Sequence, residues 1–187
     1  MQRKQVVWIT LIALLASLAC TIFVGGPDYP EQTIPITAED AEALREQIRV
    51  ALEAGATSGV LSLQITEAQL TSLLAEKLAE QSDPLFNEPQ VHLREGQMKV
   101  YGKGQRGVFL YNISLTMAVT VDELGQPNVE LVEANFGPMP VPEGINNAIS
   151  TLVAEAYTGS LGPVLTGFRL ESILIADGVM TISGRIK

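Results

Sequence analysis

The feature that most constrains the fold of this chain is the run from Val108 to Val121, in which apolar and polar residues alternate. Successive side chains of a β-strand point to opposite faces, so a period of two predicts one long strand with an apolar face. That face carries Phe109, Tyr111, Ile113, Leu115, Met117, Val119 and Val121. Such a strand belongs in a sheet, and a second layer must cover its apolar face.

Further short strands and amphipathic helices follow from the same kind of pattern. Alternation predicts strands within 60–65, 91–102, 129–136 and 173–184. Apolar residues at helical spacing, with capping residues before them, predict helices from Thr37 to Gly55, from Thr66 to Asp83 and from Ile145 to Gly159. We therefore predict an α+β fold: a curved antiparallel β-sheet of five to seven strands packed on two or three helices.

Two segments of the chain repeat one pattern. Residues 91–103 and 173–185 each alternate apolar residues around an acidic residue followed by glycine, at Glu95-Gly96 and Asp177-Gly178. Glycine supplies the positive φ that a tight hairpin turn needs, so both segments are predicted to be β-hairpins. Either an internal duplication or the independent use of a common turn explains the likeness.

The N-terminus predicts attachment to a membrane. Arg3 and Lys4 precede an uncharged run from Val6 to Val24, which as a helix would span roughly 28 Å, close to the ~30 Å hydrocarbon core. Basic residues before the run place the N-terminus in the cytoplasm and the rest outside. We expect a signal or anchor segment at 1–24, a Gly/Pro tether at 25–36 and a single extracytoplasmic domain at 37–187, located at the cell membrane.

Cys20 offers a second mode of attachment. It follows a short apolar stretch and Ala19, as does the lipidated cysteine of bacterial lipoproteins. Leu18 and Ser17 depart from the usual order of residues before such a cysteine, and Thr21 to Val24 is unusually apolar. The partner is the membrane in either case, through residues 6–24 as a helix or through a lipidated Cys20.

Composition excludes several classes of protein. The formal net charge is −9, from 12 Lys+Arg against 21 Asp+Glu, which disfavours nucleic-acid partners. One cysteine and one histidine exclude a disulfide framework and a zinc site built from several such ligands. We expect no metal and no cofactor.

No catalytic motif stands out either. Gly102 to Gly107 fits GxGxxG, but a dinucleotide site needs a helix after the glycines and the alternating run follows instead. His92 has no predicted partner, and the chain has no GxSxG or HExxH sequence. The protein is therefore expected not to be an enzyme, although a hydrolase that uses carboxylates alone remains open.

Three stretches together resemble a known family. Ile65 to Leu74, Val91 to Gly102 and Phe136 to Pro142 resemble, in order and spacing, the YpmS-like family of membrane-anchored bacterial surface proteins, and more distantly the LmeA-like phospholipid-binding proteins. The resemblance spans about residues 60–157, with Thr71 where the commonest family pattern has Asn. It implies an extracytoplasmic, non-enzymatic domain similar to tubular lipid-binding folds.

The predicted function is the binding of a lipid or similar apolar ligand between sheet and helices. Slots between such layers hold acyl chains in other proteins. The candidate lining residues are Phe109, Tyr111, Ile113, Leu115, Met117, Val119, Leu70 and Leu74. The alternative is a structural or protein-interaction module of the cell envelope with a filled core and no ligand.

Overall fold

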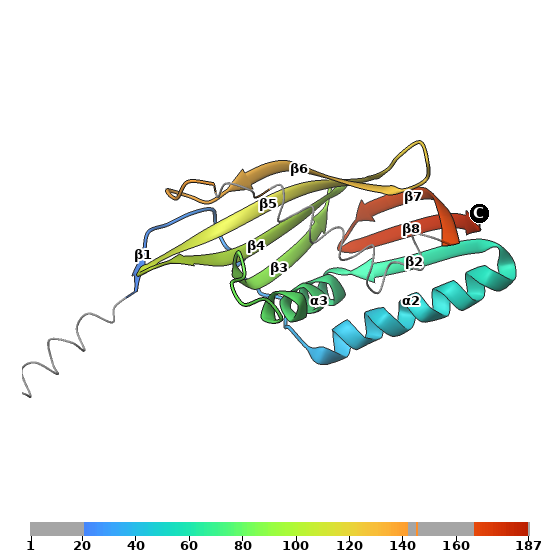
Figure 1. Ribbon diagram of the computed structural model, residues 1–187, viewed down its shortest axis with the longest axis horizontal. Helices are drawn as coiled ribbons and strands as arrows, with labels where there is room; N and C mark the ends of the chain where they lie inside the picture. Colours follow the sequence, from blue (N-terminus) through green and yellow to red (C-terminus); the bar gives the residue numbers. More distant parts are fainter. Residues whose placement is uncertain (1–20, 142–144, 146–166, 187) are drawn as a thin grey trace, which may run out of the picture.

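The computed structural model describes residues 21–141, 145 and 167–186, which form an α+β structure with two helices and eight strands (Figure 1). In chain order the elements are β1 (Ile22–Phe23), α2 (Ala38–Ser58), β2 (Val60–Thr66), α3 (Glu67–Ala79), β3 (Asn87–Arg94), β4 (Gln97–Arg106), β5 (Phe109–Val121), β6 (Pro127–Asn135), β7 (Phe168–Ala176) and β8 (Val179–Ile186). Except for Ile145, the helix expected after Pro142 lies outside the described residues, as does the N-terminal segment up to Cys20.

The strands form two sheets rather than the single antiparallel sheet expected. A curled five-stranded sheet has the order β1-β5-β4-β3, with β6 also paired to β5, and a three-stranded sheet has the order β2-β8-β7. All pairs are antiparallel except β1 with β5, so the larger sheet is mixed. The prediction of a purely antiparallel sheet was therefore wrong, because a two-residue strand is too short to show a period in the sequence.

The long helix α2 lies along β2 (Figure 1). Its N-cap is Thr37, whose Oγ1 accepts a hydrogen bond from the Asp40 backbone N–H at 3.1 Å. It continues through Gly55 and ends at Ser58, with Gly59 as C-cap at φ 76°. The predicted end at Gly55 was wrong because this glycine has a packing role: a Cβ there would lie 2.8 Å from Cζ of Phe168.

The two repeated hairpins meet at their turns. The backbone N–H of Gly96 donates to the carbonyl of Ile175 at 3.1 Å, and that of Gly178 donates to the carbonyl of Leu93 at 3.0 Å. Leu93 and Ile175 are equivalent in the repeat, and so are the two glycines. Equivalent residues thus exchange equivalent bonds, as at a local two-fold axis. This reciprocity favours an internal duplication over the independent use of one turn.

The segment expected as a tether, 25–36, is hydrogen-bonded to the larger sheet. The backbone N–H of Asn112 donates to the carbonyl of Gly25 at 3.0 Å, and the Gln90 side chain bonds both backbone groups of Ile34, at 2.6 and 3.1 Å. The Tyr29 hydroxyl donates to the carbonyl of Glu88 at 2.7 Å. Burial, together with the Glu88 charge, raises the pKa of Tyr29 to about 12. The segment therefore lies along the domain rather than hanging free of it.

Candidate functional site

The apolar face of β5 lies in the core along most of its length. Five of the predicted lining residues are buried there: Tyr111, Ile113, Leu115, Met117 and Val119. They belong to one hydrophobic cluster that also includes buried residues of β2, α2 and β7. Phe109, at the start of the same face, is exposed. The apolar positions of β5 were predicted correctly, with Phe109 exposed and Val121 half-buried at the two ends of the strand. The opposite face was predicted as polar, and Ser114 and Thr116 on that face are buried as well.

The helix α3 is buried on its polar side. Thr71, Ser72 and Gln69 are buried, whereas Leu70, Leu73 and Leu74 remain half-buried at the margin of the core. Spacing alone predicted the leucines of α3 as its covered face, and Leu78 near the end of the helix is buried as expected. The structure brings Leu70 and Leu74 against the same cluster as the β5 residues, but leaves part of each side chain accessible.

Polar residues of α3 complete the edge of the larger sheet. The backbone N–H of Val91 donates to Oγ1 of Thr71 at 3.0 Å, and the backbone N–H of Leu93 donates to Oε1 of Glu67 at 2.7 Å. Thr71 and Glu67 are one helical turn apart, and the two strand residues that they bind are two positions apart. Both separations are about 6–7 Å, so the helix can bind every second N–H of the strand. Glu67 also forms an ion pair with Arg94. These two hydrogen bonds were not predicted from the sequence. Their only sign there is a pair of acceptor side chains, Glu67 and Thr71, four residues apart on a helix.

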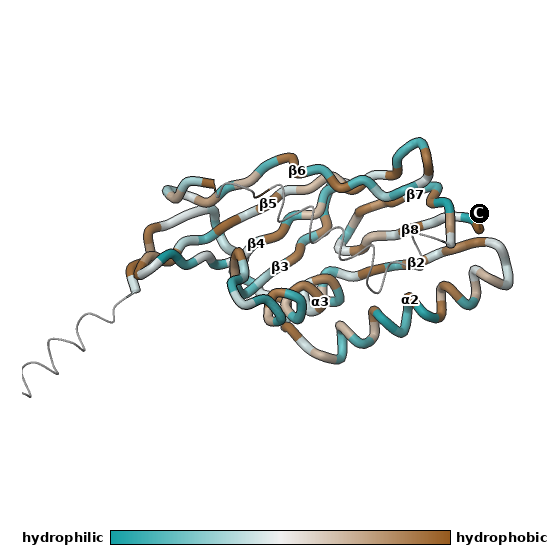
Figure 2. Tube along the Cα trace, in the orientation of Figure 1, coloured by the Kyte–Doolittle hydropathy of each residue, from teal (hydrophilic) through white to brown (hydrophobic). Residues whose placement is uncertain are grey.

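Half-exposed apolar residues continue around the core beyond α3. They come from both sheets and from the segments that join them, and Figure 2 shows apolar positions recurring along these elements. The set is Val24, Leu52, Leu70, Leu73, Leu74, Leu85, Met98, Val121, Val129, Leu131, Ala134, Met139 and Ile173. We call these partly accessible side chains, which pack against the core, the accessible apolar margin.

The GxGxxG sequence has a structural explanation. It lies at the end of β4 and leads through a turn into strand β5, not into a helix. A Cβ at Gly102 would lie 2.8 Å from Cγ of Phe86, and one at Gly104 would lie 2.5 Å from Cζ of Tyr111. These two glycines make room for aromatic rings, and Gly107 has the positive φ, 62°, of the turn. The arrangement lacks the helix N-terminus that would hold a pyrophosphate.

His92 lies between the buried residues Val91 and Leu93 of β3 and is itself half-buried. Its ring contacts that of Tyr101 edge-on, with centroids 5.3 Å apart. Desolvation lowers the pKa of His92 from its ordinary 6.5; Glu67 opposes this effect, and Arg94 and Lys99 add to it. The imidazole is therefore held in its neutral form by a partly apolar, cationic setting.

This setting predicts a pH dependence of stability. Below about pH 6.5 the unfolded chain binds a proton on His92 more readily than the folded chain does, so the free energy of unfolding falls on acidification. A His92→Gln variant should lose less stability than the wild type between pH 7.5 and pH 5.5. Thermal unfolding at both pH values, followed by circular dichroism, measures the difference, and equal losses in the two proteins would contradict the prediction.

Among residues 21–141, 145 and 167–186, no group of three or more His, Cys, Asp or Glu side chains is arranged to hold a metal ion. Within the same residues, no helix combines the length and apolar character needed to cross a membrane. Cys20 and nearly all of the predicted anchor lie outside the described part of the chain, but Ile22 and Phe23 form β1.

No protein-family model and no curated protein matches the chain. The resemblance to the YpmS-like and LmeA-like families therefore gains no support from either comparison. Among solved structures, a crystal structure of lipopolysaccharide binding protein is similar over 69% of this chain, with 13% identity and a TM-score of 0.26. The similarity covers 49% of that protein, about half its length. A likeness this weak assigns no function to the chain.

Proposed function

We propose that the protein is a non-enzymatic domain, tethered to the membrane on its extracytoplasmic side, that binds a lipid or similar apolar ligand. The observation that carries this proposal is the burial pattern of α3. Its polar residues Gln69, Thr71 and Ser72 are buried, while Leu70, Leu73 and Leu74 stay partly accessible beside the core. An apolar ligand would cover those leucines, which pack against the core that contains the apolar face of β5.

Ionisable groups support the non-catalytic part of the proposal. No Asp, Glu, Lys, Arg or His among the described residues is buried. Active sites usually hold buried titratable groups with strongly shifted pKa values that converge in a cleft. Here partial burial lowers the pKa of His92, and no carboxylate or nucleophile among the described residues is hydrogen-bonded to it.

The energetics suit a retained lipid. Burial of each methylene contributes ~0.8 kcal/mol, so an acyl chain of ordinary length provides useful affinity without any polar contact. A tether to the membrane raises the effective concentration of the domain beside its lipid source. Sequestration of the ligand, rather than its chemical conversion, would be the mechanism.

Photocrosslinking in reconstituted vesicles tests this function. The full chain is placed in phosphatidylcholine vesicles that contain a phospholipid with a diazirine in its acyl chain, and crosslinked peptides are located by mass spectrometry. We expect crosslinks within α3 and β5 in addition to those of the N-terminal segment. Replacing both Leu70 and Leu74 with Gln should remove most of the crosslinks in α3 and β5, because the half-buried face becomes polar.

A matched control separates lipid binding from loss of fold. Val50→Gln changes an exposed apolar residue of α2 and should leave the crosslinks intact. Substitutions at Ile113 or Leu115 suit this test poorly, since both side chains are buried in the core. Wild-type protein that folds but shows no crosslink beyond the N-terminal segment would overturn the proposal. The interaction module with a filled core would then explain the chain better.

A further inference from the structure

Four exposed apolar side chains gather at one end of the molecule, where β1 lies beside the turn between β4 and β5. Ile22 is 52% exposed, Phe23 60%, Val108 46% and Phe109 42%. Ile22 is paired with Phe109, and its backbone N–H donates to the carbonyl of Val108 at 2.7 Å. We call these four residues the apolar tip. Figure 2 shows apolar residues at this end.

The turn itself departs from ordinary surface chemistry. Gly107 and Val108 join β4 to β5, and Gly107 has a φ of 62°. Exposed turns of this kind usually carry polar residues such as Asn, Asp or Ser. A valine at this position, next to an exposed phenylalanine and a second apolar pair from β1, is typical of a surface that meets an apolar partner.

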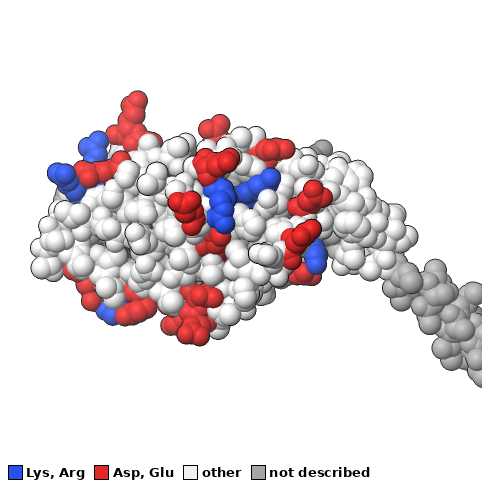
Figure 3. Space-filling view, turned by 180° about the vertical axis from the view of Figure 1, so that it is seen from behind, with Lys and Arg blue, Asp and Glu red and all other residues white. Residues whose placement is uncertain are grey.

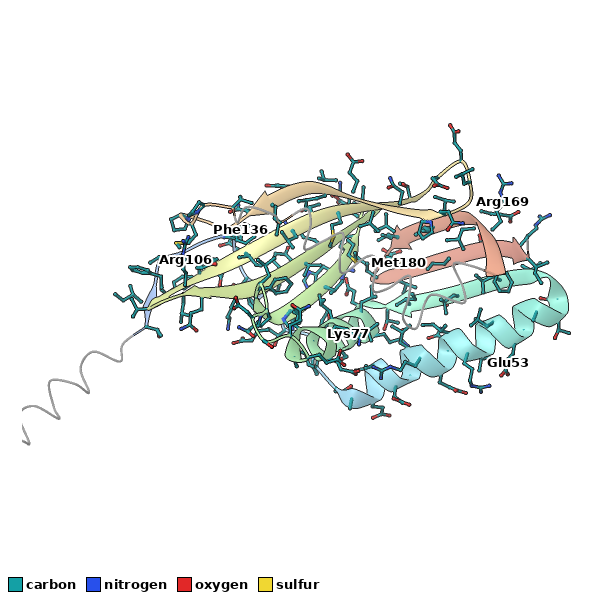
Figure 4. All side chains as sticks on the ribbon, in the orientation of Figure 1. Glu53, Lys77, Arg106, Phe136, Arg169 and Met180 are labelled. Carbon is teal, nitrogen blue, oxygen red and sulfur yellow. The ribbon has the colours of Figure 1, made fainter. Side chains whose placement is uncertain are left out.

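The charge of the same hairpin differs from that of the rest of the chain. Between Gln97 and Val121 the sequence has Lys99, Lys103 and Arg106 but no Asp or Glu, in a protein of net charge −9. Arg106 is exposed, precedes the turn (Figure 4) and forms no ion pair with any other described residue. Figure 3 shows that the end of the molecule that carries β1 in Figure 1 is free of charged side chains on the face in view. Lys103 forms an ion pair with Glu88, so Arg106 is the cation that the apolar tip offers to an anionic phospholipid surface.

The length of the N-terminal run brings this tip to the bilayer. Because β1 takes up Ile22 and Phe23, the uncharged sequence that remains for crossing is Val6 to Thr21, about 24 Å as a helix against a core of ~30 Å. The bilayer becomes thinner around a span that is too short, so the residues that follow such a span stay close to the leaflet. If Cys20 carries the lipid instead, only Thr21 separates it from Ile22. Both modes of attachment place the tip at the membrane surface.

We propose that the apolar tip inserts into the outward leaflet of an anionic phospholipid bilayer, with Arg106 at the level of the phosphates. This inference rests on the proposed tether. It also gives the bound lipid a route of entry, because Phe109 lies on the same face of β5 as the buried Tyr111 and Ile113. The apolar face of β5 then begins in the bilayer and continues into the core.

Depth-dependent quenching of tryptophan tests the insertion. The full chain carries Trp8→Phe, which removes its one tryptophan, together with Phe109→Trp. Vesicles of phosphatidylcholine and phosphatidylglycerol are prepared with and without acyl-chain bromination. We expect the brominated lipid to quench most of the fluorescence of the Phe109→Trp variant. The matched control is Leu124→Trp in the same background, at an exposed position in the turn at the other end of β5, and it should keep its fluorescence.

Flotation of the same vesicles separates the possible failures. If the Phe109→Trp protein floats with the vesicles but its fluorescence is not quenched, the tether is present and the proposed insertion is overturned. Equal quenching of both variants also overturns it, because the domain would then lie flat. Protein that fails to float contradicts the tether and the insertion together, whereas the lipid crosslinks within α3 report on ligand binding independently.

Arg106→Glu tests the role of the charge. This substitution should weaken the quenching on vesicles that contain phosphatidylglycerol more than on vesicles of pure phosphatidylcholine. Equal effects on the two kinds of vesicle would overturn the role of Arg106.

Discussion

Replacing Gly102 with alanine should destabilise the protein by about 1–3 kcal/mol, because the new methyl group has no space. Gly102 lies in the middle of β4, where it pairs with Ile113 of β5. A Cβ there would lie 2.8 Å from Cγ and 3.1 Å from Cβ of Phe86, a buried residue of the core. The ring must move away, and close packing around it leaves no alternative position.

Urea unfolding followed by circular dichroism measures this effect. Gly167→Ala is the matched control, because a Cβ at Gly167 meets no atom within 4 Å, and we expect a change of less than about 0.5 kcal/mol there. Phe86→Leu should also destabilise, by leaving a cavity. The double variant Gly102→Ala with Phe86→Leu should then lose about 0.5–3 kcal/mol less than the sum of the two single variants. Strict additivity would show that the ring does not lie over Gly102.

Features of the fold with a local cause could be predicted from the sequence. The strand β5 has a period long enough to be recognised, and the capping box of Thr66 and Gln69 begins α3 as expected. Both hairpin turns use the acidic-Gly pair, with positive φ at Glu95, Gly96, Asp177 and Gly178. In each case the interactions that decide the structure lie within a few residues of one another.

Features that depend on distant residues could not be predicted in this way. The strand β1 exists because Ile22 and Phe23 pair with Phe109 and Leu110, some 87 residues later in the chain. The sequence around Gly55 predicts the end of a helix, but the glycine is required there because the ring of Phe168 packs against it. Phe109 shares the period of the buried β5 residues and is nevertheless exposed, since it lies at the end of the strand beyond the second layer.

The repeated hairpins illustrate the same limit. Gly102 and Gly184 occupy equivalent positions in the two repeats. A Cβ at Gly102 would meet the ring of Phe86, whereas one at Gly184 would lie 2.6 Å from the carbonyl oxygen of Arg169 in β7. A bulge between Leu170 and Ser172 brings that backbone close. Glycine thus occupies both positions for two different steric reasons.

The extent of α3 could be predicted from the sequence, but not which of its sides is buried. Spacing identified Leu70 and Leu74 correctly as apolar positions of α3, yet it could not show that the other side of the helix is the buried one. That side is fixed by partners far away in sequence: Ser72 accepts a hydrogen bond from the Thr37 backbone N–H at 3.1 Å, and Gln69 donates to Gln47 at 3.0 Å. Hydrogen bonds to other elements, together with the burial of Leu78, orient α3.

Replacing Thr71 with valine tests that orientation directly. Thr71 is 0% exposed, and its Oγ1 is the acceptor for the Val91 backbone N–H. Valine has nearly the same shape but no acceptor, so this N–H becomes a buried donor without a partner, at a cost of about 1–3 kcal/mol. Thr71→Ser keeps the oxygen and loses only a methyl group, so it should lose less stability than the valine variant.

Urea unfolding of both variants, together with hydrogen exchange at the Val91 amide, separates loss of the bond from loss of packing. In Thr71→Val the Val91 amide should exchange faster than in the wild type, while in Thr71→Ser it should remain protected. A valine variant as stable as the serine variant, with the Val91 amide still protected from exchange, would mean that the Thr71 hydroxyl does not hold the edge of β3 by this hydrogen bond. In that case the leucines, rather than the polar residues, would determine which side of α3 faces the sheet, and the accessible apolar margin would lose its explanation.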